Sequence, residues 1–416
     1  MNTGQERINE FVIREKRGRL GMRSEWTKKK LSDIVDFNPR ETIKKGTIAK
    51  KIPMDVLRPF YRDIPYSVEA CFSGGMKFRN GDTIMARITP CLENGKTAQV
   101  SILNDGEVGF GSTEYIVFRA KEGIADKDYL YYLVCSPEVR ELAIKSMVGS
   151  SGRQRVQTDV VKNLEIDVPP LVEQEKIGSF LKLFDDKIAL NDKINNNLEQ
   201  QAEAIFQSIL SNAITTVNLG EIADVKGGKR LPKGVNLIDI PNSHPYIRVR
   251  DLNNALFASL TPNYAYVDEE TQKSISRYIV STGDVLISIV GTIGLTAIVD
   301  STLDKANLTE NCVKVTNLKH ITPEYLLLYL RSQLGREAIT KGTVGAVQQK
   351  LPIKNIQAIP IPLLSEKDKN TLFCTLDSIF AEISSNVIQS AKLSSLRDTL
   401  LPKLMSGELD VSDIDL

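Results

Sequence analysis

The strongest constraint on the fold of this chain is an internal duplication. Five short segments recur in the same order, each at an offset of about 190–200 residues. The paired segments are Leu31–Asp36 with Leu219–Asp224, Asn80–Met85 with Thr282–Ile287, Asp128–Leu130 with Glu324–Leu326, Val148–Ser150 with Val344–Ala346, and Val168–Leu171 with Ile361–Leu364. Because five matches in one order do not arise by chance, the sequence predicts a tandem repeat of a unit of about 190 residues.

Each copy divides into a mixed part and a purely helical part, which predicts an α+β fold class. Short β-branched runs broken by Gly, Pro and Asn predict strands in both mixed parts. These runs are Asp82–Ile88, Thr113–Arg119, Asp284–Val290 and Cys312–Thr316. Each mixed part also predicts one helix, near Lys127–Met147 in the first copy and near Pro323–Lys341 in the second. The long helical parts begin after proline-containing stops.

The change between mixed and purely helical sequence patterns along the chain predicts five segments. They are an N-terminal extension (1–25), a first mixed domain (26–165), a central helical spacer (166–213), a second mixed domain (214–359) and a distal helical spacer (360–416). Lys and Arg counted against Asp and Glu give net charges of +6 for 1–165, −4 for 166–213, +3 for 214–359 and −4 for 360–416. Two basic units separated by acidic segments suit two contacts with a polyanion, although offsets of this size also occur as ordinary scatter.

A regular apolar seam runs along the central helical spacer. Its positions are spaced alternately by four and three residues, which averages to the period of a coiled coil. The seam consists of Ile177, Leu181, Phe184, Ile188, Asn191, Asn195, Leu198, Ala202, Ile205 and Ile209. A looser seam in the distal spacer contains Leu372, Leu376, Ile379 and Ile383.

The two seams predict that the duplicated helices pack on each other as a long antiparallel coiled coil, which joins the mixed domains and gives the molecule a pseudo-two-fold axis. Asn191 and Asn195 are expected to fix the register of that pairing at some cost in stability. The alternative is that each helix only lies on its own mixed domain.

Composition excludes several classes of protein. No apolar run is long enough for a membrane span, and the charged N-terminus lacks the apolar region of a secretory signal. Five widely spaced cysteines and two isolated histidines argue against disulfides, a metal site and histidine-based catalysis. We therefore predict a cytoplasmic protein with no metal site and no contact with a membrane.

Motifs for catalysis fail in this sequence. Leu92–Thr97 resembles the end of a phosphate-binding loop, but Pro90 stands where that loop needs a glycine. Asn38-Pro39 begins like the motif of amino-methyltransferases, but an arginine and a glutamate follow it. The triplet Asp185-Asp186-Lys187 is a weak nuclease motif, and its position on the long helix predicts a solvated face instead. No residue of this chain is predicted to be catalytic, and any chemistry is expected to belong to a partner.

Several segments resemble type I restriction–modification specificity subunits. Leu183–Asn191 and Asn197–Ala202 are similar to the central conserved region of that family, and Leu396–Leu409 is similar to its distal conserved region. Arg87–Lys96 resembles a recurring segment of its target recognition domains. The ordered combination covers nearly the whole chain, apart from the first 22 residues or so.

The resemblance implies that each mixed domain is a target recognition domain for one half of a bipartite double-stranded DNA sequence. It also implies that the antiparallel helices separate these domains and dock two methyltransferase subunits, which bind S-adenosylmethionine and methylate adenine. Restriction subunits with motor and nuclease activity join for cleavage. This chain itself is then a non-catalytic subunit without a cofactor. A self-contained DNA methyltransferase or nuclease, and a coiled-coil scaffold without DNA function, are the alternatives.

Candidate DNA contacts are basic and amide side chains in glycine-rich loops, where the backbone can approach a duplex closely. In the first copy they are Arg87, Asn94, Lys96, Arg153, Gln154 and Arg155. In the second copy they are Lys229, Arg230, Lys233, Arg248, Arg250, Lys341, Gln348, Gln349 and Lys350. The alternative for each residue is an ordinary solvated surface charge, and we expect about half of the set to approach DNA.

Overall fold

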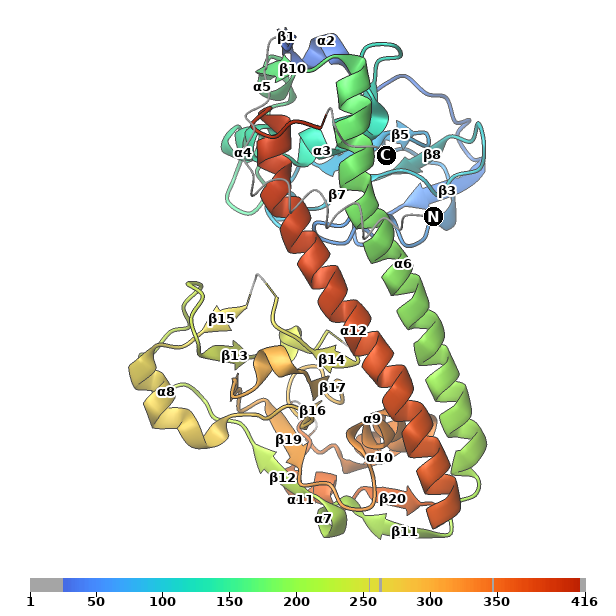
Figure 1. Cartoon of the computed structure of the whole chain (residues 1–416), viewed down its shortest axis with the longest axis vertical. Coiled ribbons are helices and arrows are strands. Elements are labelled where there is room, and N and C mark those ends of the chain that lie inside the picture. The colour runs from blue at the N-terminus through green and yellow to red at the C-terminus, as the bar shows by residue number, and fades with distance from the viewer. Residues whose placement is uncertain (1–24, 254, 262–263, 346–347, 412–416) are drawn as a thin grey trace. The chain divides into compact units, whose positions relative to one another are not determined.

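The chain folds into two compact units (Figure 1). A computed structural model describes residues 25–253, 255–261, 264–345 and 348–411. Unit 1 extends to Asp192 and includes the chain from Ile388 onward, whereas unit 2 is Lys193–Val387. The N-terminal extension predicted for residues 1–25 lies outside the described residues except for its last position. The other domain boundaries stay a prediction, since the compact units divide the long helices as well.

The mixed part of unit 1 contains two four-stranded sheets. One has the strand order β2 (Val35–Phe37), β9 (Tyr115–Ala120), β6 (Thr83–Ala86), β7 (Thr97–Gln99). The other has the order β4 (Val68–Cys71), β3 (Ile48–Ile52), β8 (Gly109–Gly111), β5 (Lys77–Phe78). Neighbouring strands are antiparallel except for β3 and β8. Strand β6 is buried on both faces, because Ile84 and Met85 point into two different hydrophobic cores.

The mixed part of unit 2 repeats this plan with a five-stranded and a three-stranded sheet. The larger sheet has the order β12 (Asp224–Gly227), β19 (Cys312–Thr316), β16 (Val285–Ser288), β17 (Thr296–Val299), β14 (Phe257–Ala258). The smaller sheet has the order β15 (Ala265–Tyr266), β13 (Pro245–Ile247), β18 (Asn307–Leu308), and helix α8 (Glu269–Ile275) follows β15. The four strands predicted from β-branched runs are confirmed as β6, β9, β16 and β19.

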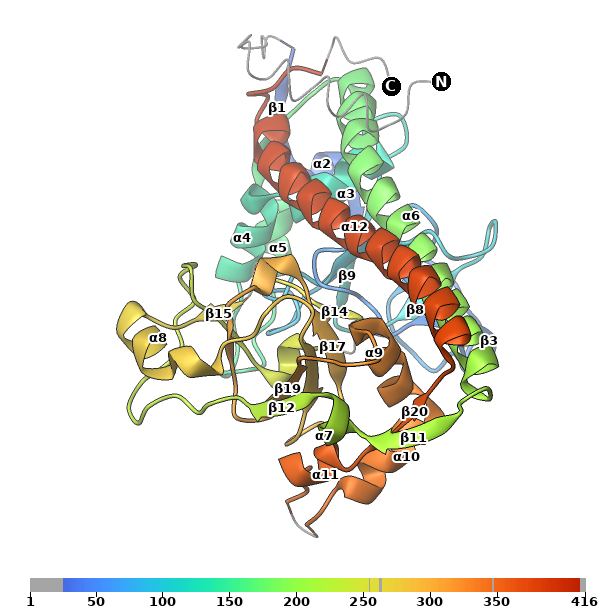
Figure 2. The same ribbon diagram turned by 60° about the horizontal axis from the view of Figure 1, so that its bottom comes forward.

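A two-stranded antiparallel ribbon joins the beginning and the end of each mixed part. In unit 1, β1 (Thr27–Lys30) pairs with β10 (Glu165–Val168). In unit 2, β11 (Thr215–Asn218) pairs with β20 (Pro360–Leu363), and Figure 2 shows this ribbon beside the start of the last long helix. Each ribbon is followed directly by a long helix, so the ribbon fixes where that helix leaves its unit. Four short helices pack nearby: α2 (Leu31–Ile34), α5 (Thr158–Lys162), α7 (Leu219–Ile222) and α11 (Ile353–Gln357).

The single helix predicted in each mixed part is wrong, because two helices stand there in both copies. In unit 1, α3 (Lys127–Cys135) and α4 (Pro137–Lys145) are separated by Ser136, which is extended at φ −61° and ψ 152°. Pro137 explains this break, since the residue before a proline avoids the helical region.

The equivalent break in unit 2 has no proline. There α9 (Pro323–Arg331) and α10 (Gln333–Gly342) are separated by Ser332, whose hydroxyl accepts a hydrogen bond of 3.2 Å from the Gly335 amide. A Cβ at Gly335 would lie 2.0 Å from the Tyr329 carbonyl oxygen. The close approach of the two helices therefore depends on this glycine together with the serine cap.

The long helices α6 (Leu171–Leu210) and α12 (Glu366–Met405) contain 40 residues each and contribute one half to each unit. In unit 1, the seam residues Ile177, Leu181, Phe184 and Ile188 share a core with Leu393, Leu400 and Leu404 of α12 and with α3. In unit 2, Ala202 and Phe206 share a core with Leu372, Leu376, Phe380 and Ile383 of α12 and with α9. Each half-helix therefore packs both on its partner helix and on its own mixed part, so the two alternatives for the seam apply together.

Amide side chains of the two long helices pair where the half-helices of each unit end. Asn191 donates from Nδ2 to Gln389 Oε1 (2.9 Å), and Asn386 donates from Nδ2 to Asn195 Oδ1 (3.0 Å). Residue numbers rise along α6 as they fall along α12, since Asp185 faces Arg397 and Asn191 faces Gln389. The two helices therefore pair in antiparallel orientation. The remaining seam residues Leu198, Ile205, Ile209 and Ile379 are half-buried. Neither long helix, nor any other helix in the described part of the chain, is long and apolar enough to span a bilayer.

The solvated face predicted for the Asp-Asp-Lys triplet of α6 is wrong at Asp185. Only 5% of its side chain is exposed, and it accepts hydrogen bonds from the Tyr132 hydroxyl (2.6 Å) and from the Arg397 guanidinium. The reason is a pairing across more than 200 positions of sequence, since Arg397 on α12 supplies the charge that allows a carboxylate to be buried. Asp186 is the more exposed neighbour and forms ion pairs with Arg62 and Lys182.

Candidate nucleic-acid interface

A short hairpin in unit 1 carries three of the predicted DNA contacts. Val148 and Arg155 exchange two backbone hydrogen bonds (3.1 and 2.9 Å), and the chain reverses between them. Gly149 adopts φ +135°, and a Cβ there would lie 3.0 Å from the Arg153 carbonyl oxygen. Because a side chain would be strained in this conformation, glycine is required for the turn. The hairpin presents Arg153 and Arg155 as exposed side chains and leaves Gln154 half-buried.

The same hairpin is repeated in unit 2. Val344 and Lys350 exchange two backbone hydrogen bonds of 2.9 Å each, and Gly345 adopts φ +103°. A Cβ at Gly345 would lie 2.4 Å from the Gln348 carbonyl oxygen. Gln348, Gln349 and Lys350 are all exposed. The duplication therefore produces one polar, partly cationic hairpin in each unit, at the same place in the chain fold.

In both units, the hairpin lies against the loop that follows the central buried strand. In unit 1, the Thr89 amide donates to the Gln154 carbonyl (3.0 Å) and the Gln154 amide to Thr89 Oγ1 (3.0 Å). Farther along the same loop, Asn94 is exposed. Lys96 is held differently, since its ammonium donates to the Met54 carbonyl oxygen (2.8 Å). The Val156 amide donates to the carbonyl of half-buried Arg87 (2.9 Å), which places Arg87 beside the hairpin of Gln154 and Arg155. Lys96 instead has a contact that stabilises the loop.

The predicted contacts of unit 2 fall into three places. Lys229 and Arg230 follow β12 after Gly228, and Lys233 is exposed farther along the same loop. The Lys229 ammonium lies 5.5 Å from the centroid of the Tyr278 ring. Arg230 is 81% exposed, and its guanidinium pairs with Glu310 at 2.7 Å.

A second place in unit 2 is the single turn of 3₁₀ helix at Val249–Asp251. Arg248 donates from Nε (2.8 Å) and Nη2 (2.9 Å) to the Asp251 carboxylate, so its guanidinium stabilises this turn. Arg250 stays exposed at the surface. Lys341 and the hairpin that follows it are the third place.

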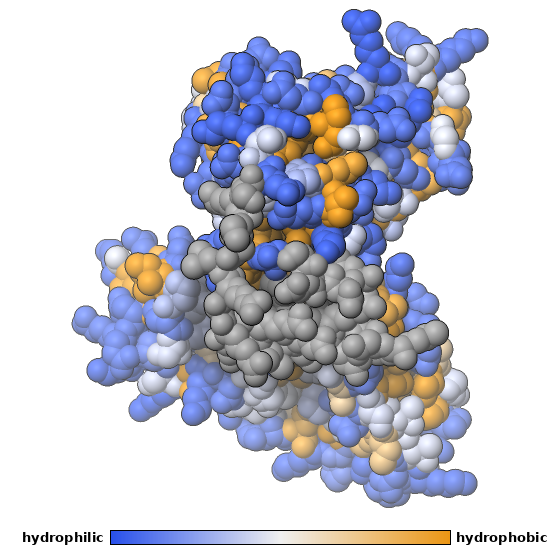
Figure 3. Space-filling view, turned by 45° about the horizontal axis from the view of Figure 1, so that its top comes forward, coloured by the Kyte–Doolittle hydropathy of each residue, from blue (hydrophilic) through white to orange (hydrophobic). Residues whose placement is uncertain are grey.

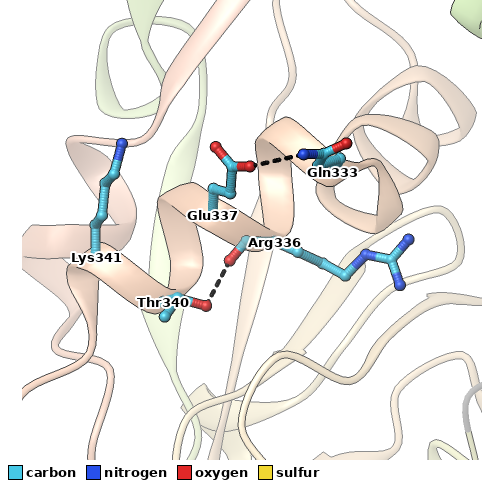
Figure 4. Close-up of a pocket in the computed structure, with 5 residues that line it drawn as sticks. All are labelled: Gln333, Arg336, Glu337, Thr340 and Lys341. Carbon is cyan, nitrogen blue, oxygen red and sulfur yellow. Dashed lines mark hydrogen bonds between the residues drawn. The ribbon is translucent and has the colours of Figure 1, made fainter.

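An open depression of about 500 Å³ runs along α10 at this third place. Its lining residues are Gln333, Arg336, Glu337, Thr340 and Lys341. Figure 4 shows the Gln333 amide donating to the Glu337 carboxylate, while the Arg336 and Lys341 side chains point in different directions. A lining supplied by one face of one helix lacks the convergent apolar walls of a cofactor site. Its two cations suit contact with phosphates instead.

Two carboxylates beside the predicted DNA contacts, Glu114 and Glu310, were not predicted from the sequence. The Arg155 guanidinium donates to Glu114 from Nη2 (2.6 Å) and from Nε (3.0 and 3.1 Å), and this hydrogen bonding holds the pKa of Glu114 below its usual range. Burial acts most strongly on Glu310 and raises its pKa, but the hydrogen bonds from Arg230, from the backbone and from Thr309 together outweigh burial, so the pKa is lowered. The available signal was the dipeptide Thr-Glu, which recurs at 113–114 and 309–310 at the offset of the duplication.

On the face shown in Figure 3, the coloured surface is mostly hydrophilic, and hydrophobic residues form small separate patches. Val148 and Val344 are exposed apolar side chains at equivalent positions of the two hairpins, at 56% and 49%. A polar, cation-bearing surface with single apolar side chains suits a nucleic acid, which offers phosphates together with base edges and thymine methyl groups.

The two arginines of the unit 1 hairpin are expected to respond differently to removal. Arg153 is exposed, and no partner for it is found among the described residues, so Arg153→Ala is expected to weaken binding equally on all sequences and to lower the salt slope by about one. Arg155→Ala is expected to weaken specific binding by about 1–3 kcal/mol and to relax one base position. Binding isotherms at several salt concentrations check both results. An unchanged affinity and slope for both variants would place the hairpin away from DNA.

The chain thus belongs to the class of duplicated α+β proteins in which two related units each carry a polar, cation-bearing hairpin at the same place in the fold. Residues 23–200 and 213–392 match the type I restriction modification DNA specificity domain, and the chain belongs to this family.

Individual relatives agree with this membership. The specificity subunit of the type I restriction enzyme HindI from Haemophilus influenzae is 22% identical over 413 residues, covering 80% of this chain and 87% of that protein. The specificity subunit of EcoAI from Escherichia coli is 34% identical over 158 residues, and that of EcoEI is 29% identical over 208 residues. The chain spans 26% and 33% of the lengths of these two relatives.

A solved structure shows the same fold. The crystal structure of the type I restriction–modification S subunit from M. genitalium superposes with a TM-score of 0.55, covering 91% of this chain and 96% of that one. Sequence identity between the two is 16%, so the similarity concerns the fold.

Proposed function

We propose that this chain recognises a bipartite double-stranded DNA sequence for a type I restriction–modification complex, with each unit reading one half. The repetition of one cationic hairpin, Val148–Arg155 in unit 1 and Val344–Lys350 in unit 2, carries the proposal. Two related but non-identical surfaces suit a target with two different halves. Family membership supports the same reading.

The chemistry belongs to partners in this proposal. Two methyltransferase subunits dock on the long helices, bind S-adenosylmethionine and methylate adenine, and restriction subunits join them for cleavage. This chain supplies no catalytic residue and binds neither cofactor nor metal. The failed catalytic motifs of the sequence support that division, and the predicted cytoplasmic location belongs to the same proposal.

Reconstitution of the full chain with a methyltransferase subunit tests the proposed function. We expect a mobility shift of DNA and adenine methylation at one bipartite sequence only when both proteins and S-adenosylmethionine are present. Methylation by this chain alone would support the alternative of a self-contained enzyme. Indifference to DNA in every combination would support the scaffold alternative.

The recognition units are expected to act as separate modules. Exchanging residues 218–359 for the corresponding part of another family member is expected to change one half of the methylated sequence and to leave the other half intact, because each unit folds around its own cores. Mapping of methylated adenines in cells carrying the chimera measures both halves at once. A change in both halves would contradict modularity.

A further inference from the structure

In unit 1, three chain segments form a ladder of backbone hydrogen bonds at the end of the sheet that contains β6 and β9. The Arg87 amide donates to the Glu114 carbonyl (2.9 Å), and the Val156 amide donates to the Arg87 carbonyl (2.9 Å). This ladder places the Glu114 side chain beside the hairpin residue Arg155, which precedes Val156. Backbone hydrogen bonds among these three segments therefore fix the positions of the two residues that form the Glu114–Arg155 ion pair.

Unit 2 repeats the ladder. The Ile289 amide donates to the Asn311 carbonyl (2.8 Å), and the Leu351 amide donates to the Ile289 carbonyl (3.0 Å). Glu310, next to Asn311, lies at the corresponding end of the sheet. Its arginine comes from a different segment, since Arg230 follows β12. A glutamate thus holds an exposed arginine at this end of the sheet in both units, although the two arginines have different origins in the chain and Glu310 stands one position before the residue equivalent to Glu114.

A carboxylate at this place weakens any contact with the phosphate backbone. Affinity for DNA without regard to sequence comes from cations that replace counterions, and a negative charge among them acts against it. Glu114 and Glu310 are 24% and 30% exposed, so their charges reach the surface that carries the candidate DNA contacts. These carboxylates would therefore lower the affinity of a surface that binds DNA without regard to sequence. They can raise specificity, because discrimination also depends on repulsive or unpaired contacts with the wrong sequence.

The donor geometry shows what the carboxylate leaves available. An arginine carries five N–H donors in a planar fork. In unit 1, Glu114 occupies the Nε and one Nη2 donor of Arg155, and Nη1 has no partner among the described residues. In unit 2, Glu310 occupies Nε of Arg230, and neither Nη atom has a partner in the described part of the chain. The outer edge of each fork therefore offers the paired donors that match O6 and N7 of guanine.

We propose that Glu114 and Glu310 are specificity-determining positioning residues: each orients an arginine, Arg155 in unit 1 and Arg230 in unit 2, to read one guanine in each half of the target. The carboxylate fixes the plane of the guanidinium before binding, so less conformational freedom is lost on contact with the base. A base that cannot accept both hydrogen bonds leaves the fork unpaired, and this loss discriminates against it. The inference rests on the proposed function of the chain.

Charge-neutral variants of the full chain test this proposal in complex with the methyltransferase subunits. Glu114→Gln is expected to lower discrimination at one G·C pair of one half-site by about tenfold, and Glu310→Gln is expected to do the same in the other half-site. Both variants are expected to bind unrelated DNA more tightly than the wild type, since a negative charge is removed. The readouts are affinities for a library with every base varied singly, at two salt concentrations.

Matched controls are available in both units. Glu141 on α4, which pairs with Lys145, and Glu270 on α8 are exposed carboxylates that the candidate interface does not include. Glu141→Gln and Glu270→Gln make the same charge change and are expected to leave base preference unchanged. If the controls relax the same base positions as Glu114→Gln and Glu310→Gln, the effect is general charge and the proposal is wrong.

Two further outcomes separate this proposal from the proposed function. If the wild-type complex methylates a bipartite sequence and both glutamate variants keep full discrimination in both halves, the positioning role is wrong while the proposed function stands. If the wild-type complex reads no sequence at all, the proposed function fails first. A relaxed position that is not a G·C pair would also overturn the assignment of guanine.

Discussion

Replacing Arg397 by alanine is expected to lower the free energy of unfolding by about 3–5 kcal/mol, because the change leaves Asp185 buried without its partner. Arg397 is 7% exposed at its side chain and also donates to Asp398 Oδ1 (2.8 and 3.0 Å). It joins α12 to α6 within unit 1, so its loss weakens the contact of both long helices with this unit. Denaturant unfolding of the full chain measures the change. Arg336→Ala, at an exposed position in unit 2, is the control and is expected to stay within about 0.5 kcal/mol of the wild type.

The size of this effect is expected to depend on pH. Burial raises the pKa of Asp185 above its ordinary value, and Arg397 acts in the opposite direction. Without Arg397 the pKa of the folded carboxyl rises further above that of the unfolded chain. A carboxyl whose pKa is higher in the folded than in the unfolded chain costs no stability at a pH below its unfolded pKa. The cost in stability grows as the pH rises from the unfolded pKa towards the folded pKa. We therefore expect Arg397→Ala to be less destabilising at about pH 5 than at about pH 7.5.

The duplication supplies a way to repair the variant. At an offset of 195 residues, Asp185 corresponds to Phe380 and Arg397 to Ala202, and both of these are buried in unit 2. Unit 2 thus uses an apolar contact where unit 1 uses a buried ion pair. Replacing a buried pair by apolar residues of similar total volume is often neutral or stabilising.

A variant that copies unit 2, namely Asp185→Phe with Arg397→Ala and Tyr132→Leu, is therefore expected to recover most of the lost stability. Tyr132→Leu is included because its hydroxyl would otherwise lose its acceptor, and Leu328 stands at the equivalent position. If the triple variant is no more stable than Arg397→Ala, charge burial is not the cause of the loss.

The parts of the fold that depend on local pattern were predictable from the sequence. Strands such as β6 and β16 follow from β-branched runs, and the two long helices follow from apolar spacing and proline stops, because these signals lie within a few residues. Duplication strengthened each of them, since every element had to be consistent with its copy. The strands and the long helices were therefore predictable because each depends on residues that are neighbours in sequence.

The parts that depend on distant partners were not predictable. Asp185 was predicted to be solvated because a charged helical position is usually exposed, and its partner Arg397 lies 212 positions away. The break before α10 was missed because its cause, the contact of Gly335 with Tyr329, is a close approach of two backbones and leaves no proline in the sequence. Glu114 and Glu310 were missed because a search for DNA contacts selects cations, whereas their roles depend on the arginines that the fold places beside them.

Lengthening both long helices at the junction of the two units is expected to move the half-sites apart and to abolish methylation of the original target. The units meet within α6 at Asp192 and Lys193 and within α12 at Val387 and Ile388. Four residues inserted at both junctions leave every contact within a unit unchanged. They add about 6 Å of rise and a rotation of about 40° beyond one full turn.

Since B-DNA rises about 3.4 Å per base pair, the preferred spacer is expected to lengthen by about one to two pairs while both half-sites keep their sequence. Two residues inserted at the same junctions are the control, because they turn one unit by about 200° about the helix axis and are expected to abolish recognition instead of shifting it. Mapping of methylated adenines reports the spacer and the half-sites together. If the four-residue variant still methylates the original sequence, the long helices do not set the distance between the half-sites in the proposed complex, since the inserted turn would then have changed the helices without changing the spacer.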